Sequence, residues 1–148
     1  MKSSEGIPLP LAGTETAHPV NILILDDDPA RHRIFARALK GHKVRHAQHA
    51  DDFAKEILRE RADVVYLDHD LAYKVRHPTK VVDVRGHDHF VNGNDAAQFI
   101  AALFQNRRPT RVIIHSMNRH GASNIAETLE KAGVPYTVAP FNELFRNL

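Results

Sequence analysis

The stretch "VNILILDDDP", residues 20–29, joins an almost continuous apolar run to three aspartates and a proline. An apolar run without alternating polar positions is typical of a central strand in a parallel sheet, because helices cover both faces of such a strand. Pro29 suits the first turn of a helix, and Asp28 is well placed to cap it. The stretch therefore predicts a buried strand over 20–25 that leads directly into a helix.

The same alternation of strand and helix continues along the chain. Further strands are predicted over 42–47, 63–67, 110–116 and 135–140. Helices are predicted over 30–40, 51–62, 94–106 and 122–133, with a short final helix within 141–148. Strands that alternate in this way with helices predict an open, parallel α/β sheet with right-handed crossovers.

The spacing of apolar residues predicts which face of the first helix packs on the sheet. Residues at 3–4 spacing are expected to point inward, namely Ile34, Phe35, Ala38 and Leu39. The opposite face is expected to be solvated, and it carries Arg31, His32 and Arg33.

Similar reasoning applies to the next two helices. Leu58 is expected on the inner face of the helix over 51–62, with Asp51 or Asp52 as its cap. Asn94 is expected to cap the helix over 94–106, and Phe104 is expected to face the core.

Two segments do not fit the alternation. Residues 1–19 contain Ser, Gly, Thr and three prolines and are expected to form a flexible arm before a single domain over 20–148. Residues 69–93 show no helical period, although "KVVDV" at 80–84 reads as a strand. Connections of this length in a compact domain are usually functional, so we interpret this His-rich segment as an insertion at the site.

The composition restricts the classes of function. The chain has 148 residues, 43% hydrophobic and 26% charged, as in an ordinary globular domain. It has neither an apolar run of roughly 18 residues nor the apolar core of a signal peptide, so no membrane association and a cytoplasmic location are expected. A net charge of +2 does not favour nucleic acid. The absence of cysteine excludes disulfides, thiol catalysis and thiolate metal sites.

Polar, titratable residues follow three of the predicted strands. The first strand is followed by Asp26, Asp27 and Asp28, the third by Asp68, His69 and Asp70, and the fourth ends in His115 before Ser116, Met117 and Asn118. Because ligands of open α/β sheets bind at the carboxyl ends of the strands, we expect these residues to form one site. Clustered carboxylates repel one another, so the site needs protons or a cation. With oxygen ligands, Mg²⁺ is the expected ion, and Mn²⁺ or another divalent ion is the alternative.

Four segments together resemble the receiver domain of two-component response regulators, over residues 20–142. They are "NILILDDDPARHR" (21–33), "VVYLDHDL" (64–71), "RVIIHSMN" (111–118) and "VAPF" (138–141). The resemblance implies a flavodoxin-like, doubly wound sheet of five parallel strands in the order 2-1-3-4-5. It also implies that Asp26 and Asp27 bind Mg²⁺, that Asp68 accepts a phosphoryl group and that Ser116 is the hydroxyl switch residue.

The sequence departs from the receiver pattern in three places. The lysine that receivers carry after the fifth strand is replaced by Ala139, the segment 69–93 is long and His-rich, and the last helix is short. The missing lysine would contact the phosphoryl oxygens, so its loss is expected to impair acyl-phosphate formation unless another cation serves. The residues considered as substitutes are His69, Lys74, His87, His89 and His115.

These departures resemble one branch of the family. "LDHDL", the later "NG" before a helix, and "HSMN" followed by "GASNI" are similar to the cyclic-phosphate-processing receiver-like proteins. That similarity implies action on cyclic phosphate ends of RNA or on related phosphoesters.

Each site residue also has a structural interpretation. Asp70 alternatively satisfies loop amides, and His69 alternatively points into solvent. His87 and His89 are weaker metal candidates, as is Asp70, because two histidines at i and i+2 also occur in exposed loops. Ser116 and Asn118 are alternatively ordinary turn residues, because serine and asparagine favour turns.

Three functions remain open. In the first, the chain is a stand-alone receiver-like domain that acts on or senses a phosphoryl group at Asp26, Asp27 and Asp68, and signals to a partner protein without a DNA-binding domain.

In the second, it is a metal-dependent phosphoesterase that processes cyclic phosphates of a small molecule or an RNA end. His69 or His115 would be the general acid or base, and Ser116 and Asn118 would bind phosphate oxygens. In the third, it is a degenerate receiver that binds proteins without chemistry; the retained aspartates argue against this.

Overall fold

The computed structural model describes residues 18–71 and 92–145. Its centre is a parallel sheet with the strand order β2-β1-β3-β4-β5, as the resemblance implied. The strands are β1 (Asn21–Leu25), β2 (Lys43–Ala47), β3 (Val64–Leu67), β4 (Arg111–Ile114) and β5 (Tyr136–Val138). The predicted flavodoxin-like, doubly wound fold is thus confirmed.

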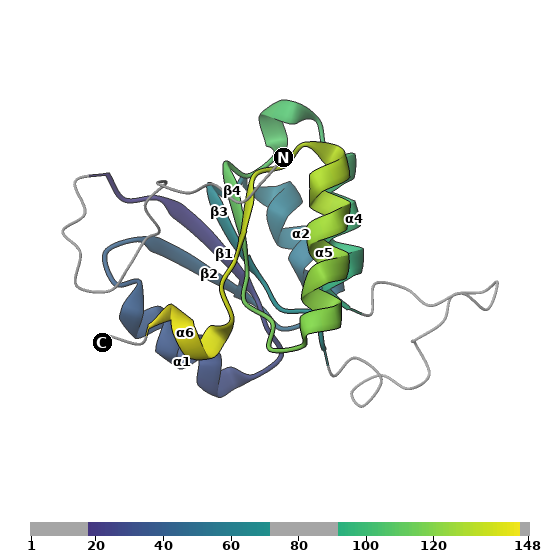
Figure 1. The fold of residues 1–148 in the computed structure, drawn as a ribbon. Helices are drawn as coiled ribbons and strands as arrows, with labels where there is room; N and C mark the ends of the chain where they lie inside the picture. The colour runs from purple at the N-terminus through teal and green to yellow at the C-terminus, as the bar shows by residue number, and fades with distance from the viewer. Residues whose placement is uncertain (1–17, 72–91, 146–148) are drawn as a thin grey trace, which may run out of the picture.

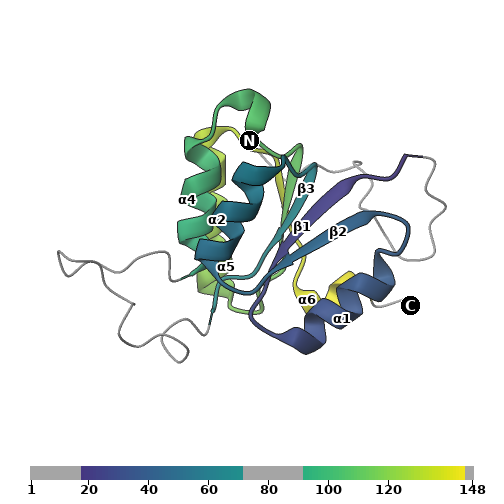
Figure 2. The ribbon, with the colours of Figure 1, turned by 180° about the vertical axis from the view of Figure 1, so that it is seen from behind.

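Helices cover both faces of the sheet (Figures 1 and 2). On one face lie α2 (Ala50–Arg59), α4 (Gly93–Ala102) and α5 (Arg119–Ala132), and on the other lie α1 (Pro29–Ala38) and α6 (Phe141–Leu144). A short 3₁₀ turn, η2 (Gln105–Arg107), leads from α4 towards β4. No helix in the described parts of the chain is long and apolar enough to cross a membrane.

Two apolar cores fill the layers between the helices and the sheet. Alternate residues of each strand face opposite cores, so that Leu23 and Leu25 of β1 pack with α2, α4 and α5, while Ile22 and Ile24 pack with Phe35 of α1. Both faces of β1 and β3 are therefore covered. This explains why these strands read as continuous apolar runs and not as alternating ones.

The register of the sheet brings three strand ends together. Leu25 at the end of β1 pairs with Leu67 at the end of β3, and Leu67 pairs with Ile114 at the end of β4. The pairing continues one residue further, because the Asp68 N–H donates to Leu25 O at 3.0 Å and the His115 N–H donates to Leu67 O at 3.0 Å. The residues after these three strands therefore lie side by side.

The helix starts agree only in part with the sequence predictions. Asp28 caps α1 as predicted, since its side chain accepts from the Ala30 N–H. The prediction for α4 was wrong, because Asn92 is the cap and forms a capping box with Asp95. α2 begins after His49 without a side-chain cap hydrogen bond, so Asp51 and Asp52 lie inside its first turn.

Three apolar residues predicted to face the core are exposed. Ile34 is 37% exposed, Leu58 54% and Phe104 82%. The inner face of α1 runs through His32, Phe35 and Ala38, which turns Ile34 outward. α4 ends at Ala102, so Phe104 lies beyond the helix and does not continue its inner face. The spacing of a few apolar residues predicts a helix, but it does not predict which of two adjacent apolar residues faces inward.

Several predictions lie outside the described residues. They concern the arm over 1–17, the strand at 80–84 and the candidate residues His87, His89 and Lys74, and they remain predictions.

Candidate metal and phosphate site

Asp26, directly after β1, is completely buried and its carboxylate is surrounded by donors. Oδ1 accepts from the Asp28 N–H at 2.8 Å and from Arg31 Nε at 3.2 Å. Oδ2 lies 2.8 Å from His115 Nε2 and 3.0 Å from Arg31 Nε. Burial opposes the charge of Asp26, but the hydrogen bonds from His115 and Asp28 and the charge of Arg31 outweigh it. They hold the pKa of this carboxyl below its ordinary value.

Arg31 is the cation nearest to this carboxylate among the ion pairs of the described residues, and the prediction that it lies on a solvated face was wrong. Its Nε pairs with Asp26, and its Nη2 lies 3.8 Å from Asp68 Oδ2. The guanidinium carbon also lies 5.6 Å from the centre of the Phe141 ring, in a cation–π contact. Arg31 thus lies between the two site aspartates.

His32 was also expected in solvent, but it is buried. Its Nε2 lies 2.7 Å from the backbone oxygen of Asp26, and its Nδ1 lies 2.6 Å from His46 Nδ1. A carbonyl oxygen only accepts, so Nε2 carries a hydrogen and donates it to Asp26. His32 therefore holds the backbone of Asp26 in place. Of the predicted solvated stretch 31–33, Arg33 alone is exposed.

His115 links the end of β4 to Asp26. Burial lowers the pKa of His115, and the carboxylate of Asp26 only partly opposes this shift. We therefore describe it as a neutral imidazole that donates through Nε2 to Asp26. Its Nδ1 is buried and has no hydrogen-bond partner within residues 18–71 and 92–145. Because the ring is almost fully buried, His115 orients Asp26 and is badly placed to exchange protons with solvent.

Asp68, directly after β3, has fewer partners than Asp26 although it is also buried. Oδ1 accepts from the His69 N–H at 2.9 Å, and Oδ2 has the distant contact with Arg31. Burial and then the charge of Asp26 raise the pKa of Asp68 to about 7, with Asp27 adding to the effect and Arg31 opposing it. Near neutral pH, this carboxyl needs a cation to be fully ionised.

His69 and Asp70 form a pair beside Asp68. His69 Nδ1 lies 2.7 Å from Asp70 Oδ1, and Asn118 donates to both oxygens of Asp70 at 3.1 and 3.3 Å. The hydrogen bond with His69 is the main cause that holds the pKa of Asp70 below its ordinary value. Asp70 is exposed, so its role in this pair is to orient the imidazole.

Two glycines allow the close packing around this turn. A Cβ at Gly93 would lie 1.9 Å from the backbone oxygen of Asp68, and a Cβ at Gly121 would lie 2.3 Å from Cγ of His69. The Gly93 N–H also donates to the His69 oxygen at 2.9 Å. The "NG" and "GASNI" segments of the sequence thus bring the starts of α4 and α5 against Asp68 and His69.

Ser116 and Asn118 shape the loop between β4 and α5. Ser116 is buried, and its Oγ accepts from the Asn118 N–H at 3.0 Å, which leaves the hydroxyl hydrogen to donate. The Asn118 side chain caps α5 by accepting from the Gly121 N–H, while its amide group donates to Asp70. Asn118 therefore organises the His69–Asp70 pair in the structure and does not point its donors at an open site.

Three of these residues form a group that fits a metal ion. One ligand atom from each of Asp26, Asp68 and His115 lies within 4.8 Å of the others. Two carboxylates are ligands that Mg²⁺ and Mn²⁺ prefer. Because His115 Nε2 donates its hydrogen to Asp26, the imidazole would join them only after that nitrogen loses its hydrogen. The raised pKa of Asp68 gives this fit a physical reason, because a cation would relieve the repulsion between the carboxylates. Asp27 is not a member of the group, but its charge acts on Asp68.

The position of the missing lysine lies at the same edge of the sheet. Ala139 donates to Ile114 O at 2.9 Å, and Phe141 donates to His115 O at 2.9 Å. The segment after β5 is thus held beside the end of β4. It also places the Phe141 ring, two residues after Ala139, against the Arg31 guanidinium.

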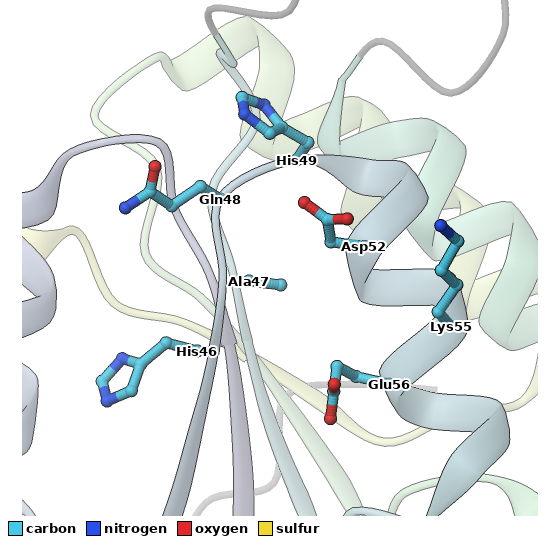
Figure 3. Close-up of a pocket in the computed structure, with 7 residues that line it drawn as sticks. All are labelled: His46, Ala47, Gln48, His49, Asp52, Lys55 and Glu56. Carbon is cyan, nitrogen blue, oxygen red and sulfur yellow. The ribbon is translucent and has the colours of Figure 1, made fainter.

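Two hollows lie near the strand ends. One of about 610 Å³ reaches from Ser116 along the start of α5 to β5, where Met117, Tyr136 and Val138 line it. The other, of about 330 Å³, lies between the end of β2 and the start of α2 (Figure 3). In Figure 3, Asp52 and Lys55 project from α2 on one side while His46 points to the other side of β2. Neither Asp26 nor Asp68 lines this second hollow, so it is separate from the site.

Sequence reasoning missed two residues that complete the site, Arg31 and His32. Their position in the sequence could have revealed them, because they follow Asp26 by five and six residues and therefore lie in the first turn of α1. Side chains in the first turn of that helix can point towards the end of the strand. The polar character of these residues suggested a solvated face instead.

Solved structures that are similar to this chain include receiver domains. The response regulator domain of Thermotoga maritima CheB is 18% identical with a TM-score of 0.52, over 82% of this chain and 78% of that chain. The receiver domain of the histidine kinase PA1611 from Pseudomonas aeruginosa, which has a magnesium ion in its active-site cleft, is 20% identical with a TM-score of 0.55, over 82% and 85%. A Burkholderia pseudomallei response regulator with a phosphorylated aspartic acid and a calcium ion is 21% identical with a TM-score of 0.53, over 86% and 68%.

Sequence identities of 18–21% to these domains establish only that the chain shares their fold. A search among curated proteins finds no match to this chain. A family model, described as the cyclic-phosphate processing receiver domain, matches residues 21–131, which is well over half of the chain and spans Asp26, Asp68 and Ser116. The chain therefore belongs to the family of cyclic-phosphate processing receiver domains.

Proposed function

We propose that this domain binds a divalent metal ion together with a phosphate ester at the ends of β1, β3 and β4, and that it opens a cyclic phosphate there. The observation that carries the proposal is the placement of two buried carboxylates, Asp26 and Asp68, beside an oriented imidazole, His69. The description of the family supports a cyclic phosphate as the substrate class.

Asp26 and Asp68 would hold the ion, with Asp27 adding negative charge beside them. Mg²⁺ or Mn²⁺ bound there would neutralise the phosphodiester and lower the pKa of a bound water. Asp68 would become fully ionised on binding, so ion binding is expected to release protons near neutral pH.

His69 is the proposed acid–base group. Because Asp70 accepts from its Nδ1–H, the Nε2 lone pair remains to take a proton from an attacking water. The water oxygen bonds to phosphorus, the bond from phosphorus to one ribose oxygen breaks, and that oxygen takes up a proton. The product is a phosphate monoester. The Ser116 hydroxyl is the proposed donor to a phosphate oxygen, and Asn118 positions the His69–Asp70 pair.

A second candidate is phosphoryl transfer to Asp68. This second function is favoured by the position of Asp68 at the end of β3, where a backbone N–H donates to one of its carboxylate oxygens. If Asp68 accepted a phosphoryl group, the output of the domain would be contact with a signalling partner.

One experiment separates the two candidates. The protein is incubated with Mg²⁺ and a 2′,3′-cyclic nucleotide, and separately with Mg²⁺ and acetyl phosphate. We expect release of a nucleoside monophosphate that is lost in Asp68→Asn and falls at least about tenfold in His69→Gln. The matched control is His120→Gln, since His120 is exposed on α5 and should leave the rate unchanged.

The outcomes that contradict the proposal are specific. Hydroxylamine-sensitive phosphate on Asp68 without hydrolysis of the cyclic nucleotide would favour phosphoryl transfer. No reaction in either mixture, together with no binding of Mg²⁺ by calorimetry, would favour a domain that only binds other proteins.

A further inference from the structure

Three groups of the protein already contact the carboxylate of Asp26. Its oxygens have contacts with the Asp28 N–H, with His115 Nε2 and with Arg31 Nε. A metal ion bound by this carboxylate would share it with the Arg31 guanidinium, and the two positive charges would repel each other, so ion binding disfavours the contact with Arg31.

Arg31 is the donor that has room to leave. The Asp28 N–H belongs to the backbone at the start of α1, and the His115 ring is buried among Phe35, Tyr66 and Phe141. The Arg31 side chain is 27% exposed, and its other end already reaches towards Asp68. A long, partly solvated side chain changes its rotamer at much lower cost than a packed ring or a helix N-terminus.

The surroundings of Arg31 also suit a phosphate. Its guanidinium lies over Phe141, two residues after Ala139, the position at which the receiver pattern has its lysine. The ring supports a positive charge at the edge of the sheet where that lysine would act. A guanidinium offers planar, paired donors that match the oxygens of a phosphate better than an ammonium does.

We propose that Arg31 exchanges partners: it neutralises Asp26 in the metal-free protein, leaves Asp26 when a divalent ion binds, and then receives the phosphate in place of the missing lysine. The inference rests on the proposed metal and phosphate site and adds the residue that couples the two ligands. The metal ion and Arg31 compete for one carboxylate, while Arg31 and the metal ion cooperate on one phosphate.

This arrangement gives Arg31→Gln two effects of opposite sign. Loss of the guanidinium removes the competitor, so Mg²⁺ should bind about tenfold more tightly. The same loss removes the phosphate donor, so inorganic phosphate should bind at least about tenfold more weakly at saturating Mg²⁺. A residue that only maintains the structure would weaken both ligands together.

The test is isothermal titration of the full chain with Mg²⁺ alone, and then with inorganic phosphate at saturating Mg²⁺. Arg33→Gln is the matched control, because Arg33 is an exposed arginine on the same helix and should change neither affinity. Arg31→Lys keeps the charge and should fall between the wild type and Arg31→Gln for phosphate. Phe141→Leu keeps the Asp26 ion pair and should weaken phosphate alone, by about threefold.

The results that overturn this inference differ from those that overturn the proposed function. If the wild type binds both ligands and hydrolyses the cyclic nucleotide, but Arg31→Gln weakens Mg²⁺ or leaves phosphate unchanged, the exchange by Arg31 is wrong and the proposed function stands. If the wild type binds neither Mg²⁺ nor phosphate, both are wrong. If Arg31→Gln does not fold, equal affinities of Arg31→Lys, Phe141→Leu and the wild type for phosphate would overturn the inference.

Discussion

Asp26 and Asp68 lie at the ends of neighbouring strands, are both buried, and have opposite pKa shifts. Asp26 has contacts with Asp28, Arg31 and His115, and its pKa is lowered. Asp68 has one close donor, the N–H of His69, and its pKa is raised to about 7. Burial is similar for the two residues, so the number of donors, and not the depth, decides which carboxyl is ionised.

The difference assigns separate tasks to the two residues. Asp26 is an anion that pairs with Arg31 in the metal-free protein. Asp68 lacks a close cationic partner and has a raised pKa, so it is the carboxyl whose protonation depends on a ligand. Two substitutions test this contrast and a third tests the His69 side chain beside Asp68; they follow in order of decreasing effect on stability.

The largest effect is expected for Asp26→Asn. The amide would remove the anionic acceptor of Arg31 and His115 and would place N–H groups near their donors. We expect the free energy of unfolding at neutral pH to fall by about 3 kcal/mol, as for other broken buried ion pairs. Urea denaturation measures it, with the exposed Asp52→Asn on α2 as the control. A loss below about 1 kcal/mol would show that Asp26 is not the structural anion.

Asp68→Asn is expected to have an intermediate effect of the opposite sign. The folded-state pKa of about 7 lies above the ordinary value of 3.8, so Asp68 lowers the stability of the metal-free protein as the pH rises from the ordinary value to about 7. The free energy of unfolding of the variant relative to that of the wild type should therefore rise by about 2 kcal/mol between about pH 5 and about pH 8.5. Urea denaturation at both pH values tests this. A constant difference between the two proteins would contradict a raised pKa.

The smallest change in stability is expected for Gly121→Ala. The new methyl group clashes with Cβ, Cγ and Nδ1 of His69, so His69 must shift, while the preference of alanine for a helix offsets part of the cost. We expect the free energy of unfolding to fall by about 1 kcal/mol while cyclic nucleotide hydrolysis falls as far as in His69→Gln.

Gly133→Ala is the control for this substitution. Its φ of 76° makes alanine unfavourable, but no atom lies within 4 Å, so it should cost stability without changing hydrolysis. Unchanged activity in Gly121→Ala would show that the orientation of His69 is unimportant.

The sheet could be predicted because its central strands are short, apolar and covered on both faces. The Asp28 cap of α1 was also predicted, since it has a local cause in the sequence. Helix faces were less predictable. His32 packs inward because two partners satisfy its ring nitrogens, and those partners lie at Asp26 and on β2. A tertiary contact of this kind leaves no trace in the local pattern.

The sequence predicted which strand ends form the site, but it did not predict which side chains contact one another there. The topology of a parallel sheet brings Asp26, Asp68 and His115 to one edge, so their proximity followed from the order of the strands. The pairing of Arg31 with Asp26 depends on the direction of one long side chain from α1, which no spacing rule provides. The substitutes first considered for the missing lysine did not include it.

The hydrogen bond between Gly93 and His69 has a consequence for the length of chain that the site tolerates. The Gly93 N–H donates to the His69 oxygen, so the backbone before residue 72 and the backbone after residue 91 meet. Each doubling of the length of a flexible connection between two such ends costs only about 0.6 kcal/mol more. We therefore expect insertions between residues 71 and 92 to leave Asp26 and Asp68 in place at small cost in stability.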